Sequence, residues 1–257
     1  MSGTRSASPP APATRPGSES LLIAAHGDCG GEGGNLLANE LARRVRLSKR
    51  YDEVVVGYMK AQPSIEEVAA HISSERIRLF PLFMSDGYYV REAIPNRLGI
   101  RDGIDALGHH VTIETPLGLL PELPGLLIQA SLAVAANAGL QTNATTLLLV
   151  AHGSENSPHS AEMARDLRDR MAAENLFRDV VVSYLEEKPF FAEQLMACPR
   201  PTIVLGLFAG GGMHATEDVR GAVAELGDPK VHIVVQLGGF AGIIEMAVAG
   251  LTRRDGA

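Results

Sequence analysis

The chain has 257 residues, a formal net charge of −7 and an apolar content of 46%. The negative charge argues against a nucleic-acid-binding protein, which would present a basic surface, and the apolar content is that of an ordinary globular protein. No apolar run approaches the roughly 20 residues needed to cross a membrane, so we expect no membrane segment or membrane partner. The two cysteines, Cys29 and Cys198, form no C-x-x-C motif, and we expect a reducing, cytoplasmic location.

Residues 1–18 consist mainly of Ser, Pro, Ala and Gly. A segment of this composition buries too little apolar surface to offset the entropy that folding removes, so we predict a disordered tail. It also lacks the apolar stretch of a secretory signal.

The first predicted element is a buried strand within residues 20–28 (SLLIAAHGD), an apolar run that stops at His-Gly. An amphipathic helix over residues 35–47 follows, and then a strand over residues 54–59. Residues 77–94 begin with a third strand, and a fourth strand (VTIETPLG) precedes a final helix (LPGLLIQASLAVA). Strands that alternate with helices in this way indicate a parallel sheet.

The same order of elements recurs in the second half of the chain. The corresponding segments are the strand at 145–154 (TTLLLVAHGS), the helix at 161–173, the strand at 180–185 (VVVSYL) and the segment 202–219, followed by a strand (VHIVVQLG) and a helix (AGIIEMAVAGL). We therefore predict an α/β fold of two tandem units, residues 19–140 and 141–257, related by internal duplication. Each unit is expected to be a mainly parallel four-stranded sheet flanked by helices.

The two halves share a register but differ in chemistry. Lys60 lies 34 residues after His26, and Glu186 likewise lies 34 residues after His152. One strand further on, Tyr89 of the first half aligns with His214 of the second half. The second half thus carries His, Glu and His where the first half carries His, Lys and Tyr.

These positions fall at the carboxyl ends of predicted parallel strands, the edge where α/β sheets bind ligands. Two imidazoles and one carboxylate suit a divalent ion such as Co²⁺, Ni²⁺, Fe²⁺ or Zn²⁺. In the first half, Lys60 places a cation where a ligand would be, and Tyr89 is a poor ligand because a phenol has a pKa of about 10. The sequence therefore predicts His152, Glu186 and His214 as a metal site, and a first half that has lost its own.

Structural explanations compete with this hypothesis. A single His at a strand end more often makes a structural hydrogen bond, and Glu186 beside Glu187 can be a solvated acidic pair. The glycine-rich loop at residues 28–35 (DCGGEGGN) lacks both the G-x-G-x-x-G and the Gly-Lys-Ser/Thr patterns, so no nucleotide site is predicted. Ser157 or Ser160 can cap the helix that follows His152.

Several short motifs resemble those of the ATP-independent sirohydrochlorin chelatases. In the second half they are A-H-G-S (151–154), Y-L-E with Pro189 (184–189) and L-F-x-x-G-G-M-H-x-x-x-D-V (207–219). The first half carries G-Y-M-K-A-Q-P-S (57–64) and P-L-F-M-S-D-G (81–87). The resemblance covers nearly everything after residue 19. It implies that a divalent metal ion, Co²⁺, Fe²⁺ or Ni²⁺, is inserted into sirohydrochlorin or a related reduced tetrapyrrole on the way to cobalamin or sirohaem, without a nucleotide.

The resemblance also implies roles for individual residues. His152 and His214 would hold the metal, which is a substrate, and assist removal of the pyrrole protons, with Glu186 at the acidic position. Candidates for binding the tetrapyrrole and its carboxylates are Ser154, Gly211, Gly212, Arg165, Lys188, Arg220, His26, Lys60 and Tyr89, with Arg91 and Arg97 from the first half. The competing hypothesis is a carrier that binds a tetrapyrrole or a metal without turnover. We expect a monomer or a homodimer.

Overall fold

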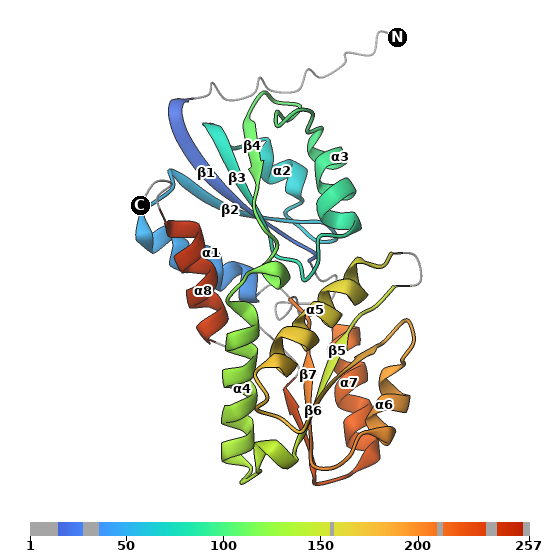
Figure 1. The fold of residues 1–257 in the computed structure, drawn as a ribbon. Helices are drawn as coiled ribbons and strands as arrows, with labels where there is room; N and C mark the ends of the chain where they lie inside the picture. The colour runs from blue at the N-terminus through green and yellow to red at the C-terminus, as the bar shows by residue number, and fades with distance from the viewer. Residues whose placement is uncertain (1–14, 28–35, 155–156, 210–212, 235–240, 254–257) are drawn as a thin grey trace, which may run out of the picture.

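The computed structural model describes residues 15–27, 36–154, 157–209, 213–234 and 241–253 (Figure 1). The first unit contains β1 (Arg15–Ala25), α1 (Leu36–Ser48), β2 (Glu53–Tyr58), α2 (Ile65–Ala69), β3 (Ser74–Pro81), the π-helix η1 (Tyr89–Ala93), α3 (Ile94–Leu98), β4 (His110–Ile113), the 3₁₀ turn η2 (Leu117–Leu119) and α4 (Leu123–Asn137). The second unit contains the 3₁₀ turn η3 (Thr142–Ala144), β5 (Thr146–Ala151), α5 (His159–Ala173), β6 (Asp179–Tyr184), α6 (Phe191–Ala197), β7 (Thr202–Gly206), α7 (Met213–Leu226), β8 (Val231–Val234) and α8 (Ala241–Thr252).

The strands form two parallel four-stranded sheets of the same topology. The order is β2-β1-β3-β4 in the first sheet and β6-β5-β7-β8 in the second, and every pairing is parallel. The predicted α/β fold of two duplicated units is confirmed. The direction in which successive strands are added to the sheet reverses between β1 and β3, and between β5 and β7. Such a switch point leaves a crevice at the carboxyl ends of these strands.

The pairing registers show where the two halves differ in length. Leu21 pairs with Val54 in the first sheet, and Leu147 pairs with Val180 in the second, so these strands correspond at a spacing of 126 residues. In β3 and β7 the spacing is 125 residues. The segment between β6 and β7 is therefore one residue shorter than the segment between β2 and β3. The alignment of Tyr89 with His214 continues the register of β3 and β7.

The first strand is longer than the sequence indicated. It begins at Arg15, so residues 15–18 belong to the sheet and the prediction of a disordered tail was wrong for them. Arg15 pairs with Ser74, and the backbone N–H of Gly17 donates to the Glu75 carboxylate at 2.7 Å. Pairing with β3 supplies partners for these backbone groups, which composition alone does not reveal. Residues 1–14 lie outside the described residues.

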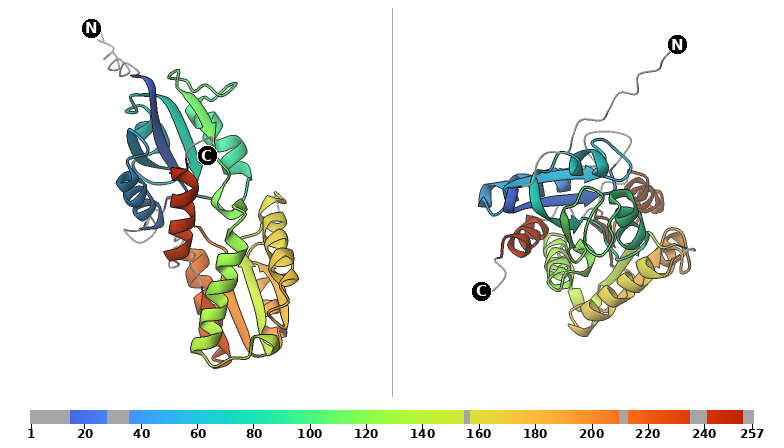
Figure 2. Two further views of the ribbon diagram at one scale, coloured as in Figure 1. Left: turned by 60° about the vertical axis from the view of Figure 1, so that its left-hand side comes forward. Right: turned by 90° about the horizontal axis from the view of Figure 1, so that it is seen from above.

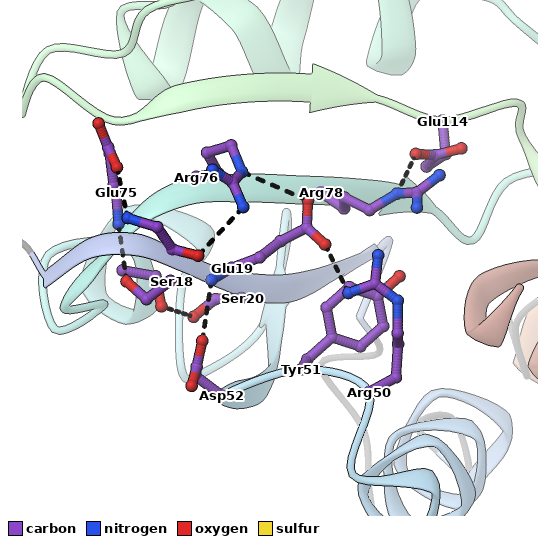
Figure 3. Close-up of polar contacts among 12 residues, drawn as sticks. Ser18, Glu19, Ser20, Arg50, Tyr51, Asp52, Glu75, Arg76, Arg78 and Glu114 are labelled. Carbon is purple, nitrogen blue, oxygen red and sulfur yellow. Dashed lines mark hydrogen bonds and ion pairs between the residues drawn. The ribbon is translucent and has the colours of Figure 1, made fainter. Parts of the chain in front are cut away.

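A network of charged side chains links the strands of the first sheet (Figure 3). The Glu19 carboxylate lies 2.8 Å from Arg50 and 3.8 Å from Arg76, and Arg78 pairs with Glu114 at 2.6 Å. The Glu19 and Arg50 side chains are only 16% and 21% exposed, so solvent screens this pair less than a surface ion pair. The network joins β1 to β3 and to the turn before β2, and it joins β3 to the residue that follows β4.

The apolar core has three parts. The largest cluster joins the inner faces of both sheets through α1, α4, α5 and α8. A second cluster lies between the first sheet and α2 and α3, and a third lies between the second sheet and α6 and α7. The two units therefore share one core instead of touching only at their surfaces. Of the helices that the structure describes, none is long and apolar enough to cross a membrane.

The last helix of each unit packs on the other unit. Helix α8 lies beside α1 of the first unit, whereas α4 lies beside α5 and β7 of the second, as both views show (Figures 1 and 2). The Tyr51 hydroxyl donates to the Leu251 carbonyl at 2.6 Å, and Arg44 forms an ion pair with Glu245. This reciprocal exchange makes each unit depend on a helix from the other half of the chain.

The packing of α8 on the first unit and of α4 on the second predicts which segment each helix stabilises. Leu251 of α8 and Leu127 of α4 are 4% and 0% exposed, so replacing either by Ala leaves a cavity that costs about 2–5 kcal/mol. We expect Leu251→Ala to accelerate amide hydrogen exchange in α1 more than in α5. The matched Leu127→Ala variant should show the opposite order. Faster hydrogen exchange confined to α5 in Leu251→Ala would contradict the proposed dependence of the first unit on α8.

Candidate functional site

The carboxyl ends of the two sheets face each other across the boundary between the units (Figure 1). Each central strand ends there in a His-Gly turn. Gly27 and Gly153 have φ of +80° and +76°, which L side chains rarely adopt. A Cβ on Gly27 would stand 2.8 Å from the Cβ of Tyr58, and one on Gly153 would stand 2.9 Å from the Cβ of Tyr184. Glycine is therefore required after each His, both by the backbone angle and by the neighbouring strand.

Backbone hydrogen bonds fix the neighbour of each histidine. The Lys60 N–H donates to the His26 carbonyl at 2.7 Å, and the Glu186 N–H donates to the His152 carbonyl at 3.0 Å. Because these bonds are equivalent in the two units, the residue 34 positions after each His must lie beside it. The spacing in the sequence thus reflects a contact at the site.

His152 and Glu186 form the pair expected at the second site. His152 Nδ1 lies 3.4 Å from a carboxylate oxygen of Glu186, and the side chains are 56% and 57% exposed. Two ligands on a tetrahedral ion, with bonds of about 2.1 Å, have their donor atoms about 3.4 Å apart. The spacing therefore fits two ligands of one ion. A polar contact this exposed is weak, so a metal can replace it at little cost.

The third predicted ligand is only partly described. His214 is the second residue of α7, which places it after β7 on the same edge of the sheet, but its side chain lies outside the described residues. Gly211 and Gly212 also lie outside them. Within the described part of the chain, no three His, Cys, Asp or Glu side chains meet as a possible metal-ligand group. The three-ligand site thus stays a prediction, of which the first two members are seen together.

The equivalent position in the first unit holds a hydrogen-bonded histidine–tyrosine pair. His26 Nδ1 lies 3.0 Å from the Gly27 carbonyl, which can only accept, so Nδ1 carries the proton. Nε2 is then the acceptor for the Tyr89 hydroxyl at 3.1 Å. Burial raises the pKa of Tyr89, which opposes formation of the phenolate that could bind a metal. With Lys60 beside it, this site offers a metal no anionic ligand from His26, Lys60 or Tyr89.

Lys60 instead lines a cavity of about 540 Å³ on the first unit. Its other lining residues are Met59, Ala61, Gln62, Ser64, Glu66 and Arg97. Arg97 donates to the Met59 carbonyl at 2.8 Å and lies 3.4 Å from Glu66. The cavity therefore combines two cations with one carboxylate. In the second unit the register places Glu186 and Ala222 where Lys60 and Arg97 stand, so this chemistry belongs to the first unit alone.

The remaining candidates are dispersed. Ser154 lies at the site, where its N–H donates to a carboxylate oxygen of Glu187 at 2.9 Å. Lys188 is exposed near the end of β6, and Arg220 is exposed on α7. Arg165 lines a second cavity of about 400 Å³ beside the edge strand β6, with Val180, Val181 and Val182 among its neighbours. Neither of these two cavities is lined by His152.

The serine-capping expectation was wrong. Pro158 is the N-cap of α5 and makes no side-chain capping bond. The Ser160 hydroxyl instead accepts from the Gly153 N–H at 3.2 Å. The first turn of α5 is thereby held against the His152 turn, a contact that the sequence does not reveal because capping and loop bonds use the same residue type.

Sequence reasoning missed the aromatic residues around Tyr89. Phe83 stacks on Tyr89 with ring centroids 5.3 Å apart, and Tyr88 meets Tyr89 edge-on at 5.6 Å. The Tyr-Tyr pair is visible in the sequence, but the ring contacts depend on how the loop after β3 folds back.

Comparison with known proteins places these features in a family. A family model described as CbiX matches residues 20–132 and again residues 146–254. A protein of Halobacterium salinarum described as a probable sirohydrochlorin cobaltochelatase is 26% identical over 228 residues, which are 78% of this chain and 75% of that protein. The two matches of the family model therefore agree with the two sheets of the same topology in showing a duplication.

Two solved structures are similar in fold. One is CbiX, described as the terminal enzyme for biosynthesis of siroheme in denitrifying bacteria, with a TM-score of 0.72 and 25% identity over 90% of this chain and 97% of that one. The other is DR2241 of Deinococcus radiodurans, a multi-domain protein with structural similarity to chelatases, with a TM-score of 0.70 and 22% identity. The match covers 93% of this chain but only 56% of the Deinococcus protein.

Placing the residue types of the second unit in the first unit should allow the first unit to bind a metal ion. The Lys60→Glu/Tyr89→His variant carries the same three residue types as the second unit, on a backbone that already places positions 26 and 60 together. We expect Co²⁺ bound per chain, measured by equilibrium dialysis, to rise from about one to about two. Lys60→Glu alone should stay at about one, because His26 still accepts from the Tyr89 hydroxyl. No increase in the double variant would contradict this account of the first site.

Proposed function

The chain belongs to the CbiX family, and we propose that it inserts a divalent metal ion, Co²⁺, Fe²⁺ or Ni²⁺, into sirohydrochlorin or a closely related reduced tetrapyrrole without ATP. The observation that carries the proposal is the contact between His152 and Glu186, at a separation that fits two ligands of one ion. The names of the relatives, a cobaltochelatase and an enzyme of siroheme biosynthesis, support this substrate class.

The reaction exchanges two pyrrole N–H protons for one M²⁺ ion. His152 and His214 hold the ion at one face of the ring, and the Glu186 carboxylate balances part of its charge. As the ring nitrogens take the ion, one imidazole is released and accepts a pyrrole proton, while the second proton passes to water. No nucleotide is consumed, because the four ring nitrogens bind the ion more favourably than water does.

The first unit contributes to substrate binding rather than to metal binding. Lys60 and Arg97 line one cavity, and cations there suit the peripheral carboxylates of the tetrapyrrole. Ser154 and Lys188 lie at the same edge of the second unit as His152. The unit that has lost its metal ligands thus serves as one wall of the substrate site.

Removing either ligand of the observed pair should abolish most of the activity without unfolding the protein. We expect His152→Ala and Glu186→Gln to lower the rate of Co²⁺ insertion into sirohydrochlorin by about 100-fold. Both side chains are more than half exposed, so the free energy of unfolding should change by less than about 0.5 kcal/mol. The visible absorption of the metallated product follows the reaction, and urea unfolding measures stability.

The matched control is His71→Ala, which removes another exposed histidine, whose Nδ1 is hydrogen-bonded to the Glu67 carbonyl of its own helix segment. It should retain the wild-type rate. If His152→Ala keeps the wild-type rate, the proposed site is wrong. If the wild-type protein binds sirohydrochlorin tightly but does not accelerate insertion, the protein is a carrier.

A further inference from the structure

Four rings form an aromatic cluster at the carboxyl edge of the first sheet. Tyr89 lies at its centre, with Phe83 stacked on one side at an interplanar angle of 16°. Tyr88 and His26 meet Tyr89 edge-on, with centroids 5.6 Å and 5.2 Å away. Each ring therefore holds its neighbours in a defined orientation.

Tyr88 and His26 are the exposed members of this cluster, and Tyr88 is the exposed aromatic side chain that carries no metal-ligand chemistry. Tyr88 is 59% exposed, whereas Tyr89 and Phe83 are partly buried. An aromatic ring contributes binding energy when it is removed from water. The exposed Tyr88 ring, which Tyr89 already holds in one orientation, therefore offers an apolar surface to a ligand.

The residue before Tyr88 is connected through helix α5 to the His152 turn of the other unit. Gly87, the residue before Tyr88, lies against His159 of α5, where a Cβ on the glycine would stand 3.5 Å from the His159 Cβ. The next residue, Ser160, accepts the hydrogen bond from Gly153, which directly follows His152. The loop after β3 therefore brings Gly87, and with it the backbone of Tyr88, to the boundary between the units, against the helix turn that contacts the His152 turn.

The second unit has no equivalent of this ring pair. The register places Met213 and His214 at the positions of Tyr88 and Tyr89. The first unit thus carries two adjacent tyrosines where the second unit carries Met213 and His214. A flat, conjugated macrocycle presents the kind of face on which an aromatic side chain stacks.

We propose that Tyr88 stacks on the tetrapyrrole ring and holds it at the boundary between the units, opposite the metal delivered by His152 and Glu186. Tyr89 orients Tyr88, and its hydrogen bond to His26 fixes Tyr89 in turn. The proposal rests on the proposed function, because it names the residue that positions the substrate of that reaction.

The test is a titration of metal-free sirohydrochlorin, followed by its visible absorption, with the full-length protein. We expect Tyr88→Ala to bind the tetrapyrrole about tenfold more weakly than the wild type. Tyr88→Phe keeps the ring and should bind within about twofold of the wild type. Met196→Ala is the matched control, because Met196 is an apolar side chain that is 76% exposed on α6; it should bind as the wild type does.

Kinetics supply a second measurement. Tyr88→Ala should raise KM for sirohydrochlorin by a similar factor and leave kcat nearly unchanged, because His152 and Glu186 are intact. Equal binding by Tyr88→Ala and the wild type would overturn the inference and leave the proposed function standing. Failure of the wild type to bind sirohydrochlorin would overturn both.

Discussion

One backbone hydrogen bond at the end of each central strand determines what the site can contain. In each unit the carbonyl of the strand-end histidine accepts the N–H of the residue 34 positions later, and the glycine after the histidine leaves room for this approach. The bond involves no side chain, so it persists whatever residue stands at the second position. Glu186 in one unit and Lys60 in the other are thereby delivered to equivalent places. A shared backbone constraint thus allowed the two sites to diverge in chemistry without a change of fold.

The exchanged helices make the duplication a single working unit. Because α8 packs on α1 of the first unit and α4 packs on α5 and β7 of the second, both sheets share one apolar core, and their carboxyl edges are held facing each other. Each edge then takes a different task in the proposed reaction. The second presents the ligands of the ion, while the first presents cations and an exposed aromatic ring. The hydrogen bond between His26 and Tyr89 in the first unit is consistent with this division.

The sequence predicted those features that depend on local pattern. Apolar runs that stop at His-Gly located the strand ends, and equal spacing placed His152 beside Glu186. It could not predict which sheet each terminal helix would cover, because α4 and α8 are apolar and fit either. The role of Ser160 and the strand formed by residues 15–18 depend on distant partners, which composition does not reveal. The ring contacts of Tyr88 required the folded loop after β3.

The central claim is that the second unit alone holds the metal, between His152 and Glu186 with His214 as the third ligand. A crystal structure of the protein with Co²⁺, with the ion located from its anomalous scattering, tests this directly. The account predicts one peak, about 2.1 Å from a His152 nitrogen, a Glu186 oxygen and a His214 nitrogen. A peak at His26, or one at His152 with Glu186 and His214 both turned away, would contradict it.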